Sequence, residues 1–198
     1  MKGNPTAQTS CIVLHCSVRL RCLIWCINCC VWAVIPAMAQ TVRQPDLELQ
    51  RSAMKKLGFL VGRWAGEARE FPPQGEPVLL AQTEEAEYKL DGLILTIEGV
   101  GRRKSDGHLA LQAFGIISYD DETSSYHFRA FNDGRFLECE ARLAEDGKGL
   151  TWGFTLGDIK THSRLHITDK GEWTEFHEIT IGSGPPKEFM EVTVSPRN

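Results

Sequence analysis

The sequence predicts an all-β fold: an antiparallel up-and-down β-barrel of about ten strands, with a short N-terminal helix that caps one end. The first observation is a series of nine turn signals between residues 72 and 185, which from Asp91 onward recur roughly every 11 to 15 residues. That spacing is typical of a strand followed by a tight turn. The second observation is that apolar and polar residues alternate between the turns. The third is that no helical pattern of about 10–15 residues interrupts them, which excludes parallel β-α-β units.

The nine turn signals are Pro72-Pro73-Gln74-Gly75, Asp91-Gly92, Asp106-Gly107, Asp120-Asp121, Asp133-Gly134, Asp146-Gly147, Gly157-Asp158, Lys170-Gly171 and Gly182-Ser183-Gly184-Pro185. Because an open sheet of ten strands leaves two edges exposed, closure into a barrel is favoured. A barrel of this size is wide enough to enclose a cavity.

Residues 1–39 have the pattern of a secretory signal peptide. Lys2, Arg19 and Arg21 precede an apolar run from Cys22 to Pro36, and Ala37-Met38-Ala39 gives a small-x-small cleavage pattern before Gln40. The run is shorter than the ~20 residues of a membrane span. We therefore expect cleavage near Ala39-Gln40, a secreted or periplasmic location, and no membrane span in the mature chain.

The cysteines do not form a disulfide framework, because six of the seven lie in the first thirty residues and only Cys139 lies beyond. Cys26 and Cys29 lack a second ligand pair at zinc-site spacing. A lipoprotein anchor is the alternative to simple cleavage, but Trp25 stands where a lipoprotein signal needs a small residue. Cys139 shares a strand face with Leu137, Ala141 and Leu143 and is expected to be a buried small hydrophobe.

The mature chain is acidic. Of the 22 basic residues three lie in residues 1–39, so 19 remain against 26 acidic ones, a net charge of −7. With no basic run, this balance argues against nucleic-acid binding. The remaining ~159 residues are enough for one substantial core, so residues 46–198 are expected to form a single domain.

Before the barrel, residues 40–45 are expected to be a flexible leader and residues 46–58 a short helix. Leu47, Met54 and Leu57 are compatible with one helical face, and Gly58 is expected to end the helix. Gly62, Trp64 and Gly66 then share one face of the first strand. A large ring between two positions without side chains suits a Trp that closes the barrel end where another backbone passes close by.

The chain also resembles a bacterial family of unknown function that is placed among the lipocalin-like, or calycin, barrels. The resemblance covers almost all of residues 50–196 and is carried by an ordered set of motifs. They are Lys55-Lys56-Leu57-x-Phe59-Leu60-Val61-Gly62-x-Trp64-x-Gly66-Glu67, Glu84-Glu85 before Leu90-Asp91-Gly92, Ser118-Tyr119-Asp120, Phe128-Arg129-Ala130-Phe131, Trp152-Gly153-Phe154 and Phe189-Met190-Glu191-Val192-Thr193.

This resemblance implies a barrel that binds a small, often apolar molecule inside. The related nitrobindins hold haem through a histidine near the C-terminus, but residues 182–198 contain no histidine here. No cofactor is therefore expected. His177 is the only histidine that we nominate as a haem or metal ligand, and no metal site is expected.

The segment from Trp173 to Ile181 is the first place to look for a functional site. Glu175 and His177 share a face with Trp173, and at ~3.3 Å per residue they lie about 6–7 Å apart along the strand. If that face points inward, the two side chains can contact one polar ligand or each other. The alternative is that Thr174, Phe176 and Glu178 face inward and leave both in water.

Two other groups of polar residues are expected to be structural. His162 and His166 lie about 13 Å apart on one strand face, too far for one metal ion, and share it with charged residues. Glu84, Glu85 and Glu87 are expected to form an exposed acidic edge that discourages strand addition, although Glu85 and Glu87 share a face and can act as a pair.

Three functions follow. The leading hypothesis is a ligand-binding barrel lined by Trp64, Tyr126, Phe128, Trp152 and Trp173, with Arg129, Glu175 and His177 as orienting groups. The second is an enzyme that uses Glu175 and His177 as an acid–base pair, and the third is a filled barrel with an envelope or interaction role. No nucleophile-elbow, phosphate-loop or dinucleotide motif is present, and no catalytic residue is assigned.

Overall fold

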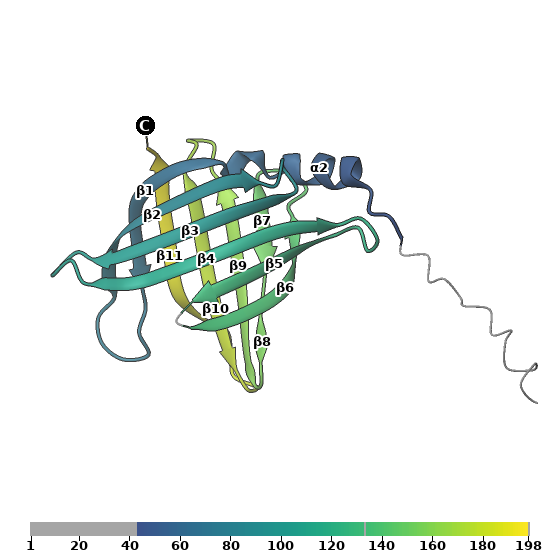
Figure 1. The fold of residues 1–198 in the computed structure, drawn as a ribbon. Helices are drawn as coiled ribbons and strands as arrows, with labels where there is room; N and C mark the ends of the chain where they lie inside the picture. Colours follow the sequence, from purple (N-terminus) through teal and green to yellow (C-terminus); the bar gives the residue numbers. More distant parts are fainter. Residues whose placement is uncertain (1–42, 133, 198) are drawn as a thin grey trace, which may run out of the picture. The chain divides into compact units, whose positions relative to one another are not determined.

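Ten strands close into an antiparallel barrel in the computed structural model, which describes residues 43–132 and 134–197 (Figure 1). The strands are β1 Gly62–Glu70, β2 Val78–Lys89, β3 Ile94–Arg103, β4 Leu109–Asp120, β5 Ser125–Asn132, β6 Arg135–Leu143, β7 Gly149–Trp152, β8 Thr155–Leu156, β9 Ile159–Ile167, β10 Trp173–Ile181 and β11 Lys187–Pro196. The two-residue β8 pairs with β9 and lies beside the closed ring. The predicted signal peptide over residues 1–39 lies outside the described residues.

The barrel is a meander closed by its first and last strands. Successive strands from β1 to β7 pair as antiparallel neighbours, β7 pairs with β9, and β9, β10 and β11 follow in order. β11 returns to β1, with Gly66 opposite Val194. Closure removes the sheet edges, as the sequence predicts. Glycines at predicted turns adopt the left-handed backbone that a tight turn requires, for example Gly107 and Gly147 at φ of 72° and 69°.

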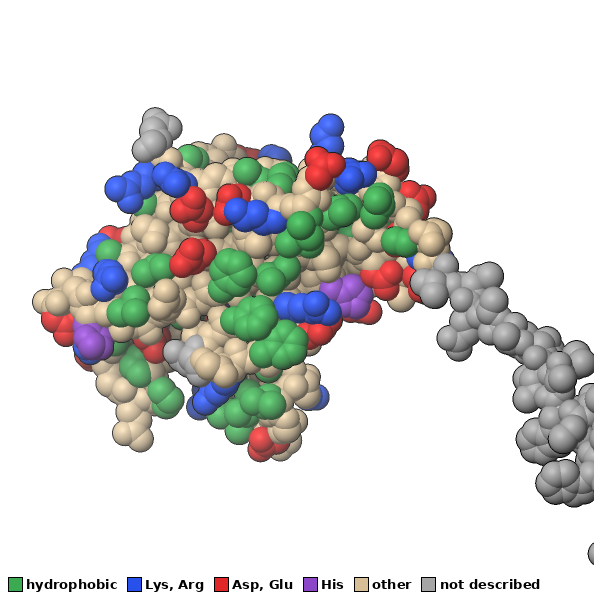
Figure 2. Space-filling model, in the orientation of Figure 1, with side chains coloured by type: hydrophobic (Ala, Val, Ile, Leu, Met, Phe, Trp, Pro, Cys, Tyr) green, Lys and Arg blue, Asp and Glu red, His purple; other side chains and the backbone are tan. Residues whose placement is uncertain are grey.

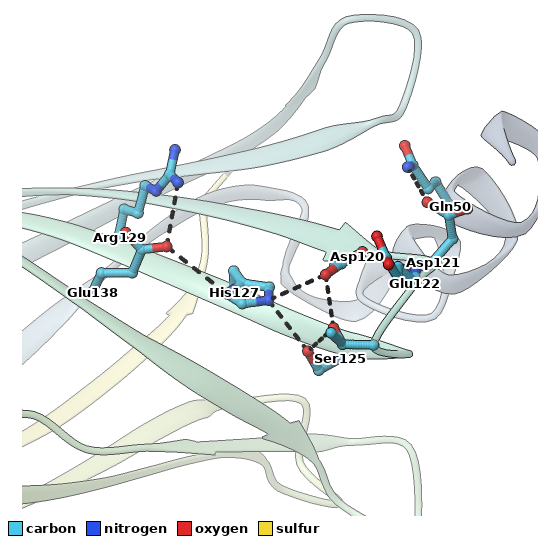
Figure 3. Close-up of polar contacts among 9 residues, drawn as sticks. Gln50, Asp120, Asp121, Glu122, Ser125, His127, Arg129 and Glu138 are labelled. Carbon is cyan, nitrogen blue, oxygen red and sulfur yellow. Dashed lines mark hydrogen bonds and ion pairs between the residues drawn. The ribbon is translucent and has the colours of Figure 1, made fainter. Parts of the chain in front are cut away.

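Helix α2, Leu47–Lys55, begins at an Asp46 cap that is tied to the barrel. The carboxylate of Asp46 accepts a hydrogen bond from the Leu49 amide at 2.9 Å. The buried Asp121, after β4, accepts from the Asp46 amide at 2.8 Å and from the Gln50 side chain at 2.7 Å (Figure 3). The helix therefore starts where the β4–β5 turn fixes it.

The other end of the helix is held by two tyrosines of the barrel wall. The Tyr126 hydroxyl donates to the Ala53 carbonyl at 2.8 Å, and the Tyr88 hydroxyl donates to the Met54 carbonyl at 2.7 Å. Both carbonyls also accept backbone bonds, Ala53 from the Lys56 amide at 3.1 Å and Met54 from the Leu57 amide at 2.9 Å. Each tyrosine therefore adds a second bond to its carbonyl and ties the helix end to the barrel wall. Burial raises the pKa of Tyr126 to about 12 and also raises the pKa of Tyr88, so both hydroxyls remain donors at neutral pH.

The helix ends slightly earlier than predicted. Lys56 is its C-terminal cap, and Gly58 begins a short 3-10 helix, Gly58–Leu60, instead of ending α2. The carbonyl of Leu60 in that turn accepts from the Trp64 indole at 2.9 Å. This bond joins the turn to the first barrel strand.

Gly66 lets β11 pass close to β1. A Cβ atom on Gly66 would lie 2.2 Å from the Thr193 carbonyl oxygen and 2.9 Å from the Val194 Cα. Trp64 is buried on the same inner face, and its ring packs edge-on against that of Trp173 with centroids 5.5 Å apart. The Gly-x-Trp-x-Gly element thus helps close the barrel end that carries α2.

Among the described residues, no helix is both long and apolar enough to cross a bilayer.

Candidate functional site

A cavity of about 390 Å³ lies inside the barrel. Its lining is mostly apolar and includes the aromatic rings of Phe128, Trp152 and Phe154. Towards the β5–β6 turn the lining includes the exposed residues Asn132 and Arg135, so the cavity reaches the surface there. A volume of this size lies in the range of small-molecule sites.

The surface beside this opening is apolar. Phe114, Phe131 and Phe136 pair across β4, β5 and β6 on the outer wall and are 39–54% exposed. Figure 2 shows hydrophobic side chains gathered over these strands. The only one of the three that also lines the cavity, among the described residues, is Phe114.

A chain of hydrogen bonds crosses one wall of the cavity. The His177 Nε2 atom lies 2.8 Å from Glu175 Oε2, and its Nδ1 atom lies 2.9 Å from the Ser163 hydroxyl oxygen. The second oxygen of Glu175 accepts from the Trp173 indole at 2.7 Å. The side chains of Glu175 and His177 are only 13% and 14% exposed, and the His177 ring packs against Trp152 and Phe189. The strand face that carries Glu175 and His177 therefore points inward.

A second acidic side chain, Glu84, enters the cavity from β2. Gln82 and Glu84 are buried on the inner face, where Gln82 Nε2 donates to Glu84 Oε1 at 2.6 Å. Burial is the main cause that raises the pKa of Glu84 well above its ordinary value, and the negative charge of Glu175 raises it further. Glu84 and Glu175 both line the cavity.

The prediction of an exposed acidic edge is therefore wrong for Glu84. β2 is paired on both sides, with β1 and β3, so it is not an edge strand. Glu85 and Glu87 do lie on the outer face, where they form ion pairs with Arg63 and Lys89. Because both faces of β2 carry charged residues, its sequence does not show which of them point inward.

Two glycines of β3 make room for the buried polar pair. A Cβ on Gly99 would lie 2.8 Å from Glu84 Oε2, and one on Gly101 would lie 2.6 Å from Gln82 Oε1. Gly99 stands opposite Glu84 and Gly101 stands opposite Gln82 in the ladder. The long side chains of β2 thus lie across β3, and this fixes where the Glu84 carboxyl enters the cavity.

The eight residues predicted to bind a ligand divide into three groups. Phe128, Trp152, Glu175 and His177 line the cavity. Trp64, Trp173 and Tyr126 are buried inside the barrel but are not part of the lining: the first two pack on each other, and Tyr126 donates to α2. Arg129 forms the third group.

Arg129 lies outside the barrel, contrary to the prediction. Its side chain is exposed and its Nη2 donates to Glu138 Oε1 at 3.2 Å on the outer face, beside His127 and Asp120 (Figure 3). The reason is the alternation of strand β5: because Phe128 faces inward, its neighbour must face out. Arg129 therefore cannot orient a molecule in the cavity.

His162, His166 and Cys139 behave as structural residues. His162 and His166 are exposed on the outer face of β9, and His166 Nε2 lies 2.9 Å from Asp146. Cys139 is half-buried, and burial raises the pKa of its thiol, which opposes nucleophilic reactivity.

The cavity does not fit a haem held by histidine. His177 is the one histidine in its lining among residues 43–132 and 134–197, and both ring nitrogens of His177 are engaged in hydrogen bonds. In the same residues no group of three or more His, Cys, Asp or Glu side chains is arranged to hold a metal ion.

Sequence reasoning missed three polar residues of the site: Gln82, Glu84 and Ser163. The sequence does carry a signal for the first two: Gln82 and Glu84 share a strand face with the apolar residues Leu80 and Ala86. Gly99 and Gly101 follow on the next strand, also two residues apart. Ser163 shares a strand face with Ile159, Leu165 and Ile167, so alternation favours an inward position for it, but nothing in the sequence links it to His177.

Comparison with known proteins supports the fold. No family model matches the chain, and no curated protein matches its sequence. Among solved structures, the chain is similar to the crystal structure of Rv2717c from M. tuberculosis, with a TM-score of 0.57 and 12% sequence identity. The match covers 74% of this chain and 98% of that one. At this identity the similarity shows a shared fold alone.

Proposed function

We propose that the barrel binds a small, largely apolar molecule in its interior. The observation that carries this proposal is the combination of a cavity of about 390 Å³ with a buried polar group on its wall. Burying Glu84, Glu175 and His177 costs free energy, and apolar side chains of similar size would fill the core better. Their position on the cavity wall gives them a role in orienting a bound molecule.

The apolar lining supplies the affinity in this proposal. Each Å² of apolar surface removed from water contributes roughly 25 cal/mol, so a ligand that covers the rings of Phe128, Trp152 and Phe154 gains most from that contact. The polar groups then fix its orientation, as in most small-molecule sites.

The test is titration with the neutral fluorescent probe N-phenyl-1-naphthylamine. We expect saturable binding of one probe per chain. Ala113→Phe places a large ring in the lining and should abolish binding, whereas Ala110→Phe, on the exposed side of the same strand, should not. Equal binding by both variants would show that the probe sits elsewhere and would refute the proposal.

A second candidate is an enzyme with an acid–base pair, favoured by the chain Glu175–His177–Ser163. With a proton on Nε2, His177 donates to Glu175 and accepts from the Ser163 hydroxyl, which orients the hydroxyl. Ser163, however, lies in mid-strand with pairing on both sides, so its backbone is committed to the sheet. Hydrolysis of p-nitrophenyl octanoate that is lost in Ser163→Ala while probe binding persists would support this candidate. Absence of turnover would reject it.

We also propose a family and a cellular location for the protein. The ordered motifs from Lys55 to Thr193 support membership of the calycin-type barrels, and the similarity to Rv2717c agrees at the level of fold. The signal pattern of residues 1–39 supports secretion or a periplasmic location. N-terminal sequencing of the protein from its own host should begin at Gln40; a start within residues 1–39 would contradict cleavage there.

A further inference from the structure

We propose that the interior site selects an amine: an apolar molecule whose ammonium group is held between the carboxylates of Glu84 and Glu175. This inference rests on the proposed function and specifies the head group of the ligand.

The polar wall has more acceptors than donors. Gln82 Nε2 serves one oxygen of Glu84, and no described residue donates to Glu84 Oε2. Gln82 Oε1 is buried without a hydrogen-bond partner among the described residues, but Gln82 is only 1% exposed and is not part of the cavity lining, so of these two side chains only Glu84 presents a free acceptor to the cavity. When Glu84 is ionised, its second oxygen is an acceptor without a donor at the cavity wall, and an ammonium group brings three donors. A ligand with donor hydrogens would therefore complete this wall.

The charges of the site also favour an amine as the ligand. Glu84 and Glu175 are the acidic residues of the described lining, and the negative charge of Glu175 adds to the raised pKa of Glu84. The described lining contains two basic side chains: His177, which is engaged by Glu175 and Ser163, and Arg135, which is exposed at the opening. A cation between the carboxylates would relieve their repulsion, whereas a carboxylate ligand would add to it.

Neighbouring side chains hold Glu84 and Glu175 in place. The Glu84 carboxyl lies over Gly99, which has no side chain in the way, and it is held by Gln82 from the same strand. On the other side, Glu175 is fixed by the Trp173 indole and by His177. Both carboxyls are therefore positioned before any ligand arrives, which lowers the entropic cost of binding.

The experiment uses the chain from Gln40 to Asn198 with N-phenyl-1-naphthylamine bound. It measures the concentrations of octylamine, octanol and octanoate that displace the probe at pH 7. The three compounds share one apolar chain and differ in the head group. We expect octylamine to displace the probe at an at least ~10-fold lower concentration than the other two, since a hydrogen bond to a charged group contributes more than a neutral one.

Three variants locate the effect. Glu84→Gln and Glu175→Gln should each reduce the advantage of octylamine about 10-fold or more, whereas Glu85→Gln, on the outer face of the same strand, should leave it unchanged. A thermal unfolding curve for each variant shows whether it is folded. If one of the two interior variants does not fold, the other still tests the inference. Loss of the advantage in Glu85→Gln alone would contradict the inference.

The remaining outcomes separate this inference from the proposed function. Equal displacement by all three compounds, or preferred binding of octanoate through Arg135, would overturn the amine proposal and leave the ligand-binding barrel standing. If the probe does not bind to the cavity at all, the proposed function itself fails.

Discussion

Replacement of Gly66 by alanine should destabilise the barrel by forcing its first and last strands apart. The added Cβ would lie 2.2 Å from the Thr193 carbonyl oxygen, 0.8 Å less than the 3.0 Å below which real Cβ contacts are essentially never found. The obstacle is backbone of the paired strand β11, so no side-chain rotation relieves it. Either β11 moves or the β1–β11 ladder opens near Val194.

Overpacking of this kind costs about 1–3 kcal/mol. For a domain of this size, about 1 kcal/mol corresponds to a shift of about 2–4 °C in Tm, so we expect Tm to fall by about 2–12 °C. The assay is thermal unfolding followed by circular dichroism. A Tm within about 1 °C of the parent protein would refute the argument that Gly66 is required by the close approach of β11.

Gly58→Ala is the matched control. Its Cβ would lie 3.6 Å from the Tyr88 hydroxyl oxygen, which is an ordinary contact. Since alanine restricts the unfolded chain more than glycine does, we expect no loss and a gain of up to about 1 kcal/mol. Equal losses at Gly58 and Gly66 would show that the close approach is not the cause.

Three further predictions concern the helix and the buried carboxyl. Tyr126→Phe removes one of the two donors to the Ala53 carbonyl and should lower the free energy of unfolding in urea by about 0.5–1.5 kcal/mol; an unchanged value would show that the bond does not hold the helix. Asp121→Ala removes the acceptor for the Asp46 amide and the Gln50 side chain and should cost about 1–3 kcal/mol, with faster amide exchange in α2. Because the pKa of Glu84 is raised in the folded protein, its ionisation costs stability as the pH rises above the ordinary value of 4.5; Glu84→Gln should therefore match the parent at pH 4 and be more stable at pH 8. A variant that is relatively less stable at pH 8 would contradict the burial of this carboxyl.

Much of the architecture could be predicted from local chemistry. Turn residues such as Asp106-Gly107 and Asp146-Gly147 mark where strands end, because glycine takes up the left-handed backbone there. Alternation of apolar and polar residues then gives the inner and outer faces, and the number of strands favours closure. Each of these signals is contained in a few neighbouring residues.

The site was less predictable because it depends on register between distant strands. Glu175 and His177 were found because they share one strand, but Glu84 and Glu175 come to line one cavity only after β1 and β11 close the ring between them. Ser163 meets His177 through the β9–β10 pairing. Depth along the barrel depends on the same register, so Trp64 and Trp173 pack at the closed end instead of lining the cavity. Arg129 is different: alternation with Phe128 already placed it outside.

Binding of an amine inside the barrel is tested most directly by a crystal structure of the protein soaked with octylamine. We expect one molecule inside the barrel, with its nitrogen within hydrogen-bonding distance of Glu84 and Glu175 and its chain along Phe128 and Trp152. A molecule bound at the opening beside Arg135, or a cavity without any bound molecule at saturating octylamine, would contradict it.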